Sequence, residues 1–366
     1  MKRVISLALL LVSAASLRAE ERSTRTKQVL SPVYTIDRKY RSEEGPWTTE
    51  KVRLEESPTR ELLWITGIRT EMVGPDGTTP TLPEFMCHVS LNFENVEKHR
   101  SDFGWGNQGI ARILALSQGQ LEARFPAGFG IPLFSDEGLT LTTKVLNHNR
   151  PDEHFQVRHL VTIEFVRDAD RRSPMKALRN IVGHVLVPLQ PSESGGMGAM
   201  HHHGHAEDGD DDEVGTAAPT MVAGILKNSS GRQFVGHWVV KPGREVRRKN
   251  VTETLQIPFD TTLHYAGVHM HPFAESLELR DLTTGKSLIK VFARPLAKGI
   301  GLEHVDSFSS EKGIPIYKDH QYQMVSVYNN TTSVDQDSMA VMFLFLLDPQ
   351  FRKPGSGATA TARSAP

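Results

Sequence analysis

Residues 276–293 read SLELRDLTTGKSLIKVFA, and this stretch decides the fold class. Polar and apolar side chains alternate with a period of two on both sides of the turn 283–285, as they do in the two strands of a β-hairpin. Short apolar runs broken by Gly, Pro, Asn and Asp recur earlier, at 85–93, 139–146 and 155–166. We therefore predict an all-β protein with two jelly-roll-like antiparallel β-sandwich domains.

Two more strands are expected near the end of the sequence, at 322–328 and 339–347, joined by the polar turn 329–337. The second run is almost continuously apolar, which is typical of a strand that is buried on both faces. We expect this strand to lie inside the protein rather than at the edge of a sheet.

The composition along the chain predicts how the domains are arranged. A basic start, a short apolar run and small residues ending at Ala19 have the pattern of a cleavable secretory signal. No later stretch has the length and hydrophobicity of a membrane-spanning helix, so we expect a secreted or periplasmic protein with no membrane span. The predicted segments are a signal peptide at 1–19, an N-terminal domain at 20–190, a His/Met/Asp-rich linker at 191–219, a C-terminal domain at 220–350 and a disordered tail at 351–366.

Several classes of protein are excluded by composition and motifs. The chain has 42 basic and 43 acidic residues, so it carries no electrostatic footprint for nucleic acid. Its single cysteine, Cys87, rules out an intrachain disulfide and Cys-x-x-Cys zinc sites. The sequence also contains no nucleophile elbow, P-loop, dinucleotide-binding glycine motif or His-Glu-x-x-His helix.

Histidine is abundant, with 16 residues, and Val268-His269-Met270-His271-Pro272 places two of them at positions i and i+2. On a strand these side chains project from the same face, so two imidazoles can chelate a metal without distorting the backbone. A His-x-His pair is a weak signal by itself, since both residues could equally be ordinary surface histidines.

Met339 and Met342, in the last apolar strand, sharpen this signal. A thioether sulfur is a soft ligand that selects Cu(I), and imidazole suits both oxidation states of copper. We therefore expect His269, His271 and Met339 to hold a three-coordinate copper with a position open to dioxygen. The alternative is that both methionines are core residues.

From Phe234 to Leu347 the chain resembles the C-terminal domain of the copper type II, ascorbate-dependent monooxygenases. This family includes peptidylglycine α-hydroxylating monooxygenase and dopamine β-monooxygenase. The landmarks are the Pro242-Gly243 step, the His269/His271 pair and Met339, which occur in the same order. The resemblance implies that the pair and the methionine bind the copper that activates oxygen.

The resemblance also implies a second, electron-delivering copper in the N-terminal domain, which three histidines bind in the family. His88 and His148 match two of these positions, and Cys87 stands where the third histidine would fall. Cys87 could be a ligand or a buried thiol outside the site. In the latter case the site has two histidines, or is completed by His154, His159 or His184.

The chain departs from the peptide-hydroxylating member of the family at its substrate-binding positions. Tyr265-Ala266-Gly267 contains no arginine where that member holds the carboxylate of its substrate. Val341 and Phe343 replace the asparagine and tyrosine that follow its copper methionine. We therefore expect a small organic substrate rather than a peptidylglycine.

The linker carries a second cluster of possible metal ligands, His201, His202, His203 and His205, flanked by Met197, Met200 and an acidic run. Such a segment could capture copper from solution, or it could be a solvated low-complexity loop that binds divalent metals only incidentally.

The hypothesis that unites these patterns is a secreted copper monooxygenase that hydroxylates a C–H bond with O2 and a reductant such as ascorbate, using two copper ions. The alternative is a non-catalytic extracytoplasmic copper-binding or delivery protein on the same scaffold. A third possibility is a carbohydrate- or protein-binding sandwich without a metal.

Overall fold

The computed structural model describes residues 24–42, 44–105, 111–189, 220–222, 225–227 and 232–353. We call 24–189 the N-terminal half and 220–353 the C-terminal half. The predicted signal peptide, the linker with its His201–His205 cluster, and residues 354–366 of the predicted tail lie outside the described residues. No helix in the described part of the chain is long and apolar enough to cross a membrane.

The N-terminal half consists mainly of strands. They are β1 (Arg25–Leu30), β2 (Tyr34–Ile36), β3 (Trp47–Val52), β4 (Leu62–Val73), β5 (Met86–Phe93), β6 (Arg112–Ser117), β7 (Glu122–Arg124), β8 (Phe129–Phe134), β9 (Leu139–Val145), β10 (Phe155–Arg167), β11 (Lys176–His184) and β12 (Val187–Pro188). One short helix, α2 (Val96–Phe103), begins at Asn95, whose side chain accepts a hydrogen bond from the Lys98 amide. It ends at Gly104, whose φ of 70° is the left-handed conformation that glycine adopts without strain.

The C-terminal half is also built of strands. They are β13 (Thr220–Val222), β14 (Ile225–Lys227), β15 (Gln233–Val235), β16 (His237–Val240), β17 (Gly243–Asn250), β18 (Thr261–Met270), β19 (Ala274–Asp281), β20 (Lys286–Pro295), β21 (Leu302–Val305), β22 (Phe308–Ile316), β23 (Tyr322–Asn330) and β24 (Gln336–Leu347), with a single helical turn, α3 (Thr252–Leu255). The hairpin predicted at 276–293 is β19 paired antiparallel with β20.

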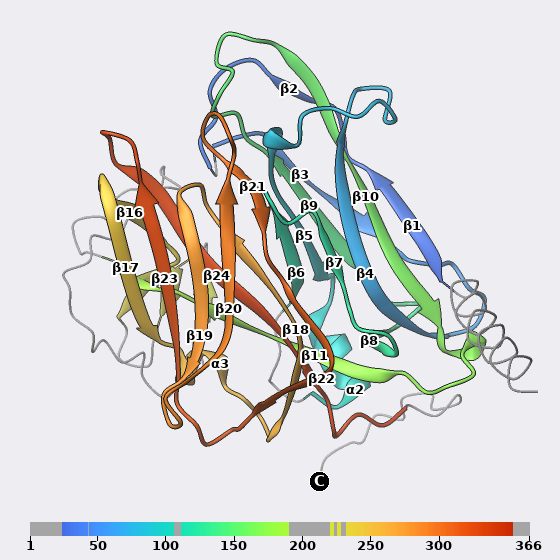
Figure 1. Ribbon diagram of the computed structural model, residues 1–366. Helices are drawn as coiled ribbons and strands as arrows, with labels where there is room; N and C mark the ends of the chain where they lie inside the picture. The colour runs from blue at the N-terminus through green and yellow to red at the C-terminus, as the bar shows by residue number, and fades with distance from the viewer. Residues whose placement is uncertain are drawn as a thin grey trace, which may run out of the picture.

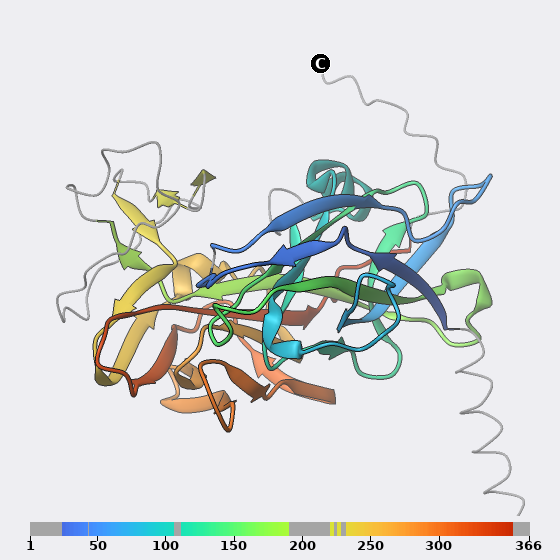
Figure 2. The ribbon, with the colours of Figure 1, turned by 90° about the horizontal axis from the view of Figure 1, so that it is seen from above.

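The two halves lie side by side and share one large sheet (Figures 1 and 2). This central sheet has the strand order β1-β10-β4-β8-β11-β24-β18-β22. Three shorter strands also pair with it, β2 with β10, β7 with β4 and β16 with β24. The sheet β3-β9-β5-β6 contributes to the core of the N-terminal half, and β17-β23-β19-β20-β21 to that of the C-terminal half. The predicted class, all-β with jelly-roll-like antiparallel sandwiches, is confirmed. A parallel pairing also occurs, between β8 and β11.

Strand β24 is the run that the sequence predicted to be buried on both faces. Its side chains at Val341, Phe343 and Phe345 belong to the core of the N-terminal half. The alternate residues, from Ala340 to Leu346, belong to the core of the C-terminal half. Each buried side chain of this size contributes about 1.5–3 kcal/mol, so β24 stabilises both cores at once.

Polar contacts fix the position of β6 and its turn against β18. The side chain of Gln120 accepts a hydrogen bond from the Val268 amide at 2.9 Å and donates one to the Tyr265 hydroxyl at 3.1 Å. Gly267 permits this approach, since a Cβ atom there would lie 2.8 Å from Gln120 Nε2. The two halves therefore meet through specific hydrogen bonds as well as through the shared sheet.

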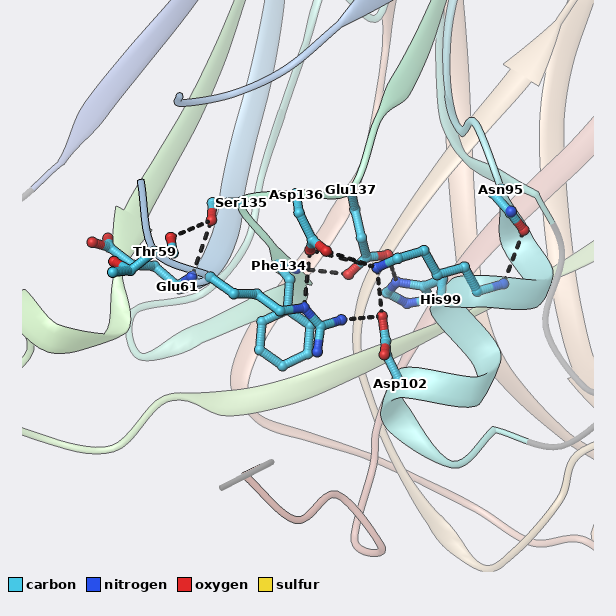
Figure 3. Close-up of polar contacts among 11 residues, drawn as sticks. Thr59, Glu61, Asn95, His99, Asp102, Phe134, Ser135, Asp136 and Glu137 are labelled. Carbon is cyan, nitrogen blue, oxygen red and sulfur yellow. Dashed lines mark hydrogen bonds and ion pairs between the residues drawn. The ribbon is translucent and has the colours of Figure 1, made fainter. Parts of the chain in front are cut away.

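A buried histidine–carboxylate pair lies at one end of the N-terminal half (Figure 3). His99 Nδ1 lies 2.8 Å from Glu137 Oε2, and the other carboxylate oxygen accepts a hydrogen bond from the Phe134 amide at 2.6 Å. Both side chains are almost fully buried, and the His99 ring stacks on Phe93 with 3.7 Å between centroids. Asp136, next to Glu137, is by contrast 44% exposed and pairs with Arg60 and Lys98.

His159, on β10, is a core histidine whose burial lowers its pKa to about 4. In an unfolded chain the pKa of histidine is about 6.5, so the unfolded state binds more protons between these values. The stability that neutral His159 contributes to the folded state is therefore complete above pH 6.5. It is lost as the pH falls toward 4, because the unfolded state takes up the proton first. We expect metal-free protein to lose about 3 kcal/mol of unfolding free energy over this interval through His159 alone.

Urea unfolding at pH 7 and pH 4, on the wild type and His159→Gln, measures this loss as the difference between the two pH dependences. Equal pH dependence in both proteins would contradict the assignment to His159.

Candidate metal centre

Two of the predicted copper ligands lie at the end of β18, where the strand's alternation positions them. Val268 and Met270 point into the core of the C-terminal half, so His269 and His271 project from the opposite face. Both imidazoles are buried, with exposed fractions of 7% and 3%. The predicted geometry of the His-x-His pair, with both side chains on one face, agrees with this arrangement.

Met339 lies beside this pair because β24 is the neighbour of β18. The antiparallel register pairs His269 with Val341 and ends with Met270 opposite Ala340, so His271 and Met339 are the next residues along the two segments, and both are hydrogen bonded to the Tyr328 hydroxyl. On its other side Met339 is paired with His237 of β16. Paired residues in adjacent strands share a face, so His237, Met339 and His271 form one row across three strands.

The imidazoles form a continuous series, which we call the histidine row: His88, His269, His271 and His237. Ring centroids are 5.8 Å apart between His88 and His269, 5.4 Å between His269 and His271, and 5.2 Å between His271 and His237. Residues from both halves therefore meet in one cluster.

Asp337 lies next to the histidine row, two residues before Met339 and on the same face of β24. One of its oxygens lies 2.8 Å from His271 Nδ1, and its two oxygens are 3.2 and 3.3 Å from His237 Nδ1. In the described part of the chain, His237, His271 and Asp337 are a group whose ligand atoms all lie within 4.8 Å of one another.

The hydrogen bonding of His271 is unusual for a buried polar side chain. Neither of its ring nitrogens has a hydrogen-bond partner, since the close approach of Asp337 to Nδ1 lacks hydrogen-bond geometry. Buried polar atoms are nearly always hydrogen bonded, and the exceptions often mark functional or ligand-binding sites. The donor set of imidazoles, a thioether and a carboxylate suits a transition metal, so the residues present fit the copper that the resemblance implies.

Two features hold His271 in place. The buried Tyr328 hydroxyl, from the opposite sheet, accepts a hydrogen bond from the His271 amide at 3.2 Å and donates one to the Met339 carbonyl. A tight turn follows, in which the Ala274 amide reaches back to the His271 carbonyl at 3.4 Å. Phe273 in this turn has a φ of 73°, a left-handed conformation that costs a non-glycine residue about 1–2 kcal/mol. Local strain of this kind is common at functional sites.

The residues predicted for the second copper are divided between the two ends of the cluster. Cys87 is buried, with its Sγ 3.5 Å from His88 Nδ1, and His88 contacts His269. His148 lies at the other end, close enough to His271 and Asp337 for their charges to affect its pKa. The structure thus places His88 against His269, and places His148 in the lining of a cavity that Asp337 also lines.

His148 is neutral at physiological pH, as a metal ligand must be. Burial, above all, and the nearby charge of Lys39 lower its pKa to about 4. Its Nε2 atom is buried and has no hydrogen-bond partner.

The other histidines considered for the second copper lie in different surroundings. His159 is a satisfied core residue, with Nε2 3.1 Å from the Lys144 carbonyl and Nδ1 3.4 Å from the Thr70 hydroxyl. His154 is exposed. His184 is half-buried on β11, and its partner Val341 on β24 is also the partner of His269.

A cavity of about 340 Å³ adjoins the centre at the junction of the two halves. Its lining includes Arg41, Glu44 and His148 from the N-terminal half, and Phe273, Asp335 and Asp337 from the C-terminal half. Because Asp337 and His148 line it, the cavity gives a small molecule access to the edge of the metal centre.

His237 and Asp337 are members of the centre that the sequence did not predict. Asp337 stands two residues before Met339 on one strand, and this spacing could have placed both on the same face. No local pattern could have identified His237, because its position depends on the pairing of β16 with β24, about 100 residues away in sequence.

No protein-family model matches the chain, and no curated protein matches it. Solved structures that resemble it include N-glycanase F (PNGase F), at 8% identity and a TM-score of 0.37, covering 89% of this chain and 96% of the other. A second structure, a peptide-N(4)-(N-acetyl-β-D-glucosaminyl) asparagine amidase, has 7% identity and a TM-score of 0.37, covering 90% and 98%. The STIV MCP has 11% identity and a TM-score of 0.27, covering 88% and 98%. TM-scores this low identify no family.

Proposed function

We propose that this chain is an exported copper-dependent monooxygenase that hydroxylates a C–H bond of a small organic substrate, using O2 and a reductant such as ascorbate. The observation that carries the proposal is His271, a buried imidazole without a hydrogen bond at either nitrogen, in line with His269 and beside Met339. The adjoining cavity, between the two halves, would receive the substrate.

In this proposal His269, His271 and Met339 hold the oxygen-activating copper, and His88 belongs to the same cluster. Copper supplies the one-electron redox chemistry and the site for oxygen, and the soft methionine favours the reduced ion. The protein contributes position and exclusion of water. Tyr328 fixes the backbone of His271 and Met339 to each other, and the packing of the two halves keeps His269 and His271 out of solvent.

The cavity lining indicates which substrates suit the site. Phe273 and Pro272 offer apolar surface, while Arg41 can donate hydrogen bonds to a polar group of the substrate. These features favour a small molecule with an apolar part to be hydroxylated.

Replacing Met339 by leucine keeps the shape of the side chain and removes the sulfur. We expect Met339→Leu to weaken Cu(I) binding at least about tenfold. Even the loss of a residue that only orients a metal ligand costs about 10- to 100-fold in metal affinity. Elemental analysis and competition with a Cu(I) chelator, under anaerobic conditions, measure the change. Met342→Leu is the matched control, because Met342 lies on the same strand but points into the opposite core. Equal Cu(I) affinity in both variants would contradict the assignment of Met339 as a copper ligand.

A non-catalytic copper-binding or delivery protein is the second candidate. It is favoured by the contact of His88 with His269, since ligands predicted for two sites form one cluster. Oxygen consumption that depends on ascorbate separates the two functions. Turnover with a hydroxylated product supports the monooxygenase, and stoichiometric copper with no oxygen uptake across a substrate panel supports delivery.

A further inference from the structure

We propose that His237, His271 and Asp337 form a binding site for a divalent first-row transition-metal ion, distinct in its chemistry from the copper set. Two of its three residues lie outside that set. The site therefore goes beyond the proposed monooxygenase function and does not depend on it.

The geometry of the three side chains is close to that of a metal site. Their ligand atoms lie within 4.8 Å of one another, and the shortest separation, between His271 and Asp337, is 2.8 Å. Ligands at about 2.0–2.2 Å from a tetrahedral ion are themselves about 3.3 Å apart. Small rotations of these side chains would therefore place all three on one ion.

Charge and ligand hardness distinguish this donor set from the copper set. Two neutral imidazoles and one carboxylate offer a net charge of about −1, which favours a doubly charged ion. His269, His271 and Met339 are all neutral and include a soft sulfur, which favours Cu(I). A set of two histidines and one carboxylate with open positions is typical of sites for divalent first-row ions.

The surroundings provide both a further ligand and an entrance. His148 Nε2 is buried without a hydrogen-bond partner, and His148 lines the same cavity as Asp337. The cavity beside Asp337 is also lined by Glu44 and Asp335, two more acidic residues that attract cations. A divalent ion can thus enter through the cavity and contact the His148 imidazole of the N-terminal half.

The test is titration of the full, copper-free chain with Co2+, whose visible absorption bands report the ligands and the coordination number. We expect Asp337→Asn and His237→Gln to weaken Co2+ binding by about 10- to 100-fold or more. The wild type and all variants contain the same His201–His205 segment. A difference in Co2+ affinity between them therefore comes from the site formed by His237, His271 and Asp337. Zn2+ competition then gives the affinity for a second divalent ion.

Two controls make the outcome decisive. Asp306→Asn removes an exposed carboxylate outside the site, 3.2 Å from the exposed His304, and we expect it to leave Co2+ affinity within about threefold of the wild type, as a screened surface charge would. Met339→Leu should retain Co2+ while losing Cu(I), so failure of the copper proposal and failure of this one give different results. Wild-type Co2+ affinity in Asp337→Asn, or an equal loss in Asp306→Asn, would overturn the site.

Discussion

His271→Ala is expected to lose the copper held by His269, His271 and Met339 almost completely, the largest effect on this centre of any single change. His271 belongs to both donor sets, and its two nitrogens have no competing hydrogen bond to give up. The remaining ligands, His269 and Met339, form too small a set to retain the ion. Copper per chain after anaerobic Cu(I) loading and desalting measures the result.

His264→Ala is the matched control for this change. His264 is also a buried histidine of β18, but its nitrogens are hydrogen bonded, to the Thr262 hydroxyl at 2.7 Å and the Ser310 carbonyl at 2.8 Å. Losing these bonds should cost about 1–3 kcal/mol of unfolding free energy and no copper. Copper retained in His271→Ala, or lost equally in folded His264→Ala, would contradict the central role of His271.

Glu137→Ala is expected to lower the unfolding free energy by about 2–5 kcal/mol, because it leaves two buried donors without their acceptor. The His99 imidazole and the Phe134 amide would both lose their acceptor in a place that water does not reach (Figure 3). Such a loss is a large part of the stability of an ordinary protein. Urea unfolding followed by tryptophan fluorescence and by circular dichroism measures it.

Asp136→Ala tests whether burial is the cause. Asp136 also forms ion pairs, with Arg60 and Lys98, but its side chain is 44% exposed. Exposed pairs of this kind contribute about 0–1 kcal/mol. Comparable losses of unfolding free energy in the two variants would contradict burial as the cause of the large effect expected for Glu137→Ala.

The fold could be predicted from the sequence where the pattern is local. The period-two alternation of 276–293 identified β19 and β20, and the apolar run at 339–347 identified β24 as a strand buried on both faces. The shared central sheet could not be predicted, because the pairing of β11 with β24 joins residues more than 150 positions apart. The alternation of polar and apolar residues in a segment does not indicate which other strand that segment pairs with.

The same distinction applies to the candidate site. His269 and His271 were found because their spacing alone places them on one face. The contact between His88 and His269, and the place of His237, depend on how β5, β16 and β18 meet in space. The two-domain division remains a prediction, since its boundary at 191–219 lies outside the described residues.

The double role of β24 has a consequence for how the chain is made. On the ribosome, the strands from β1 to β10 emerge long before residues 336–347, yet Val341, Phe343 and Phe345 are needed to complete their core. Until then the early strands carry an unfilled apolar surface, the state in which β-rich chains of high contact order are most prone to aggregate. The arrival of residues 336–347, rather than the emergence of the first half, is therefore the step at which the core of the N-terminal half can close.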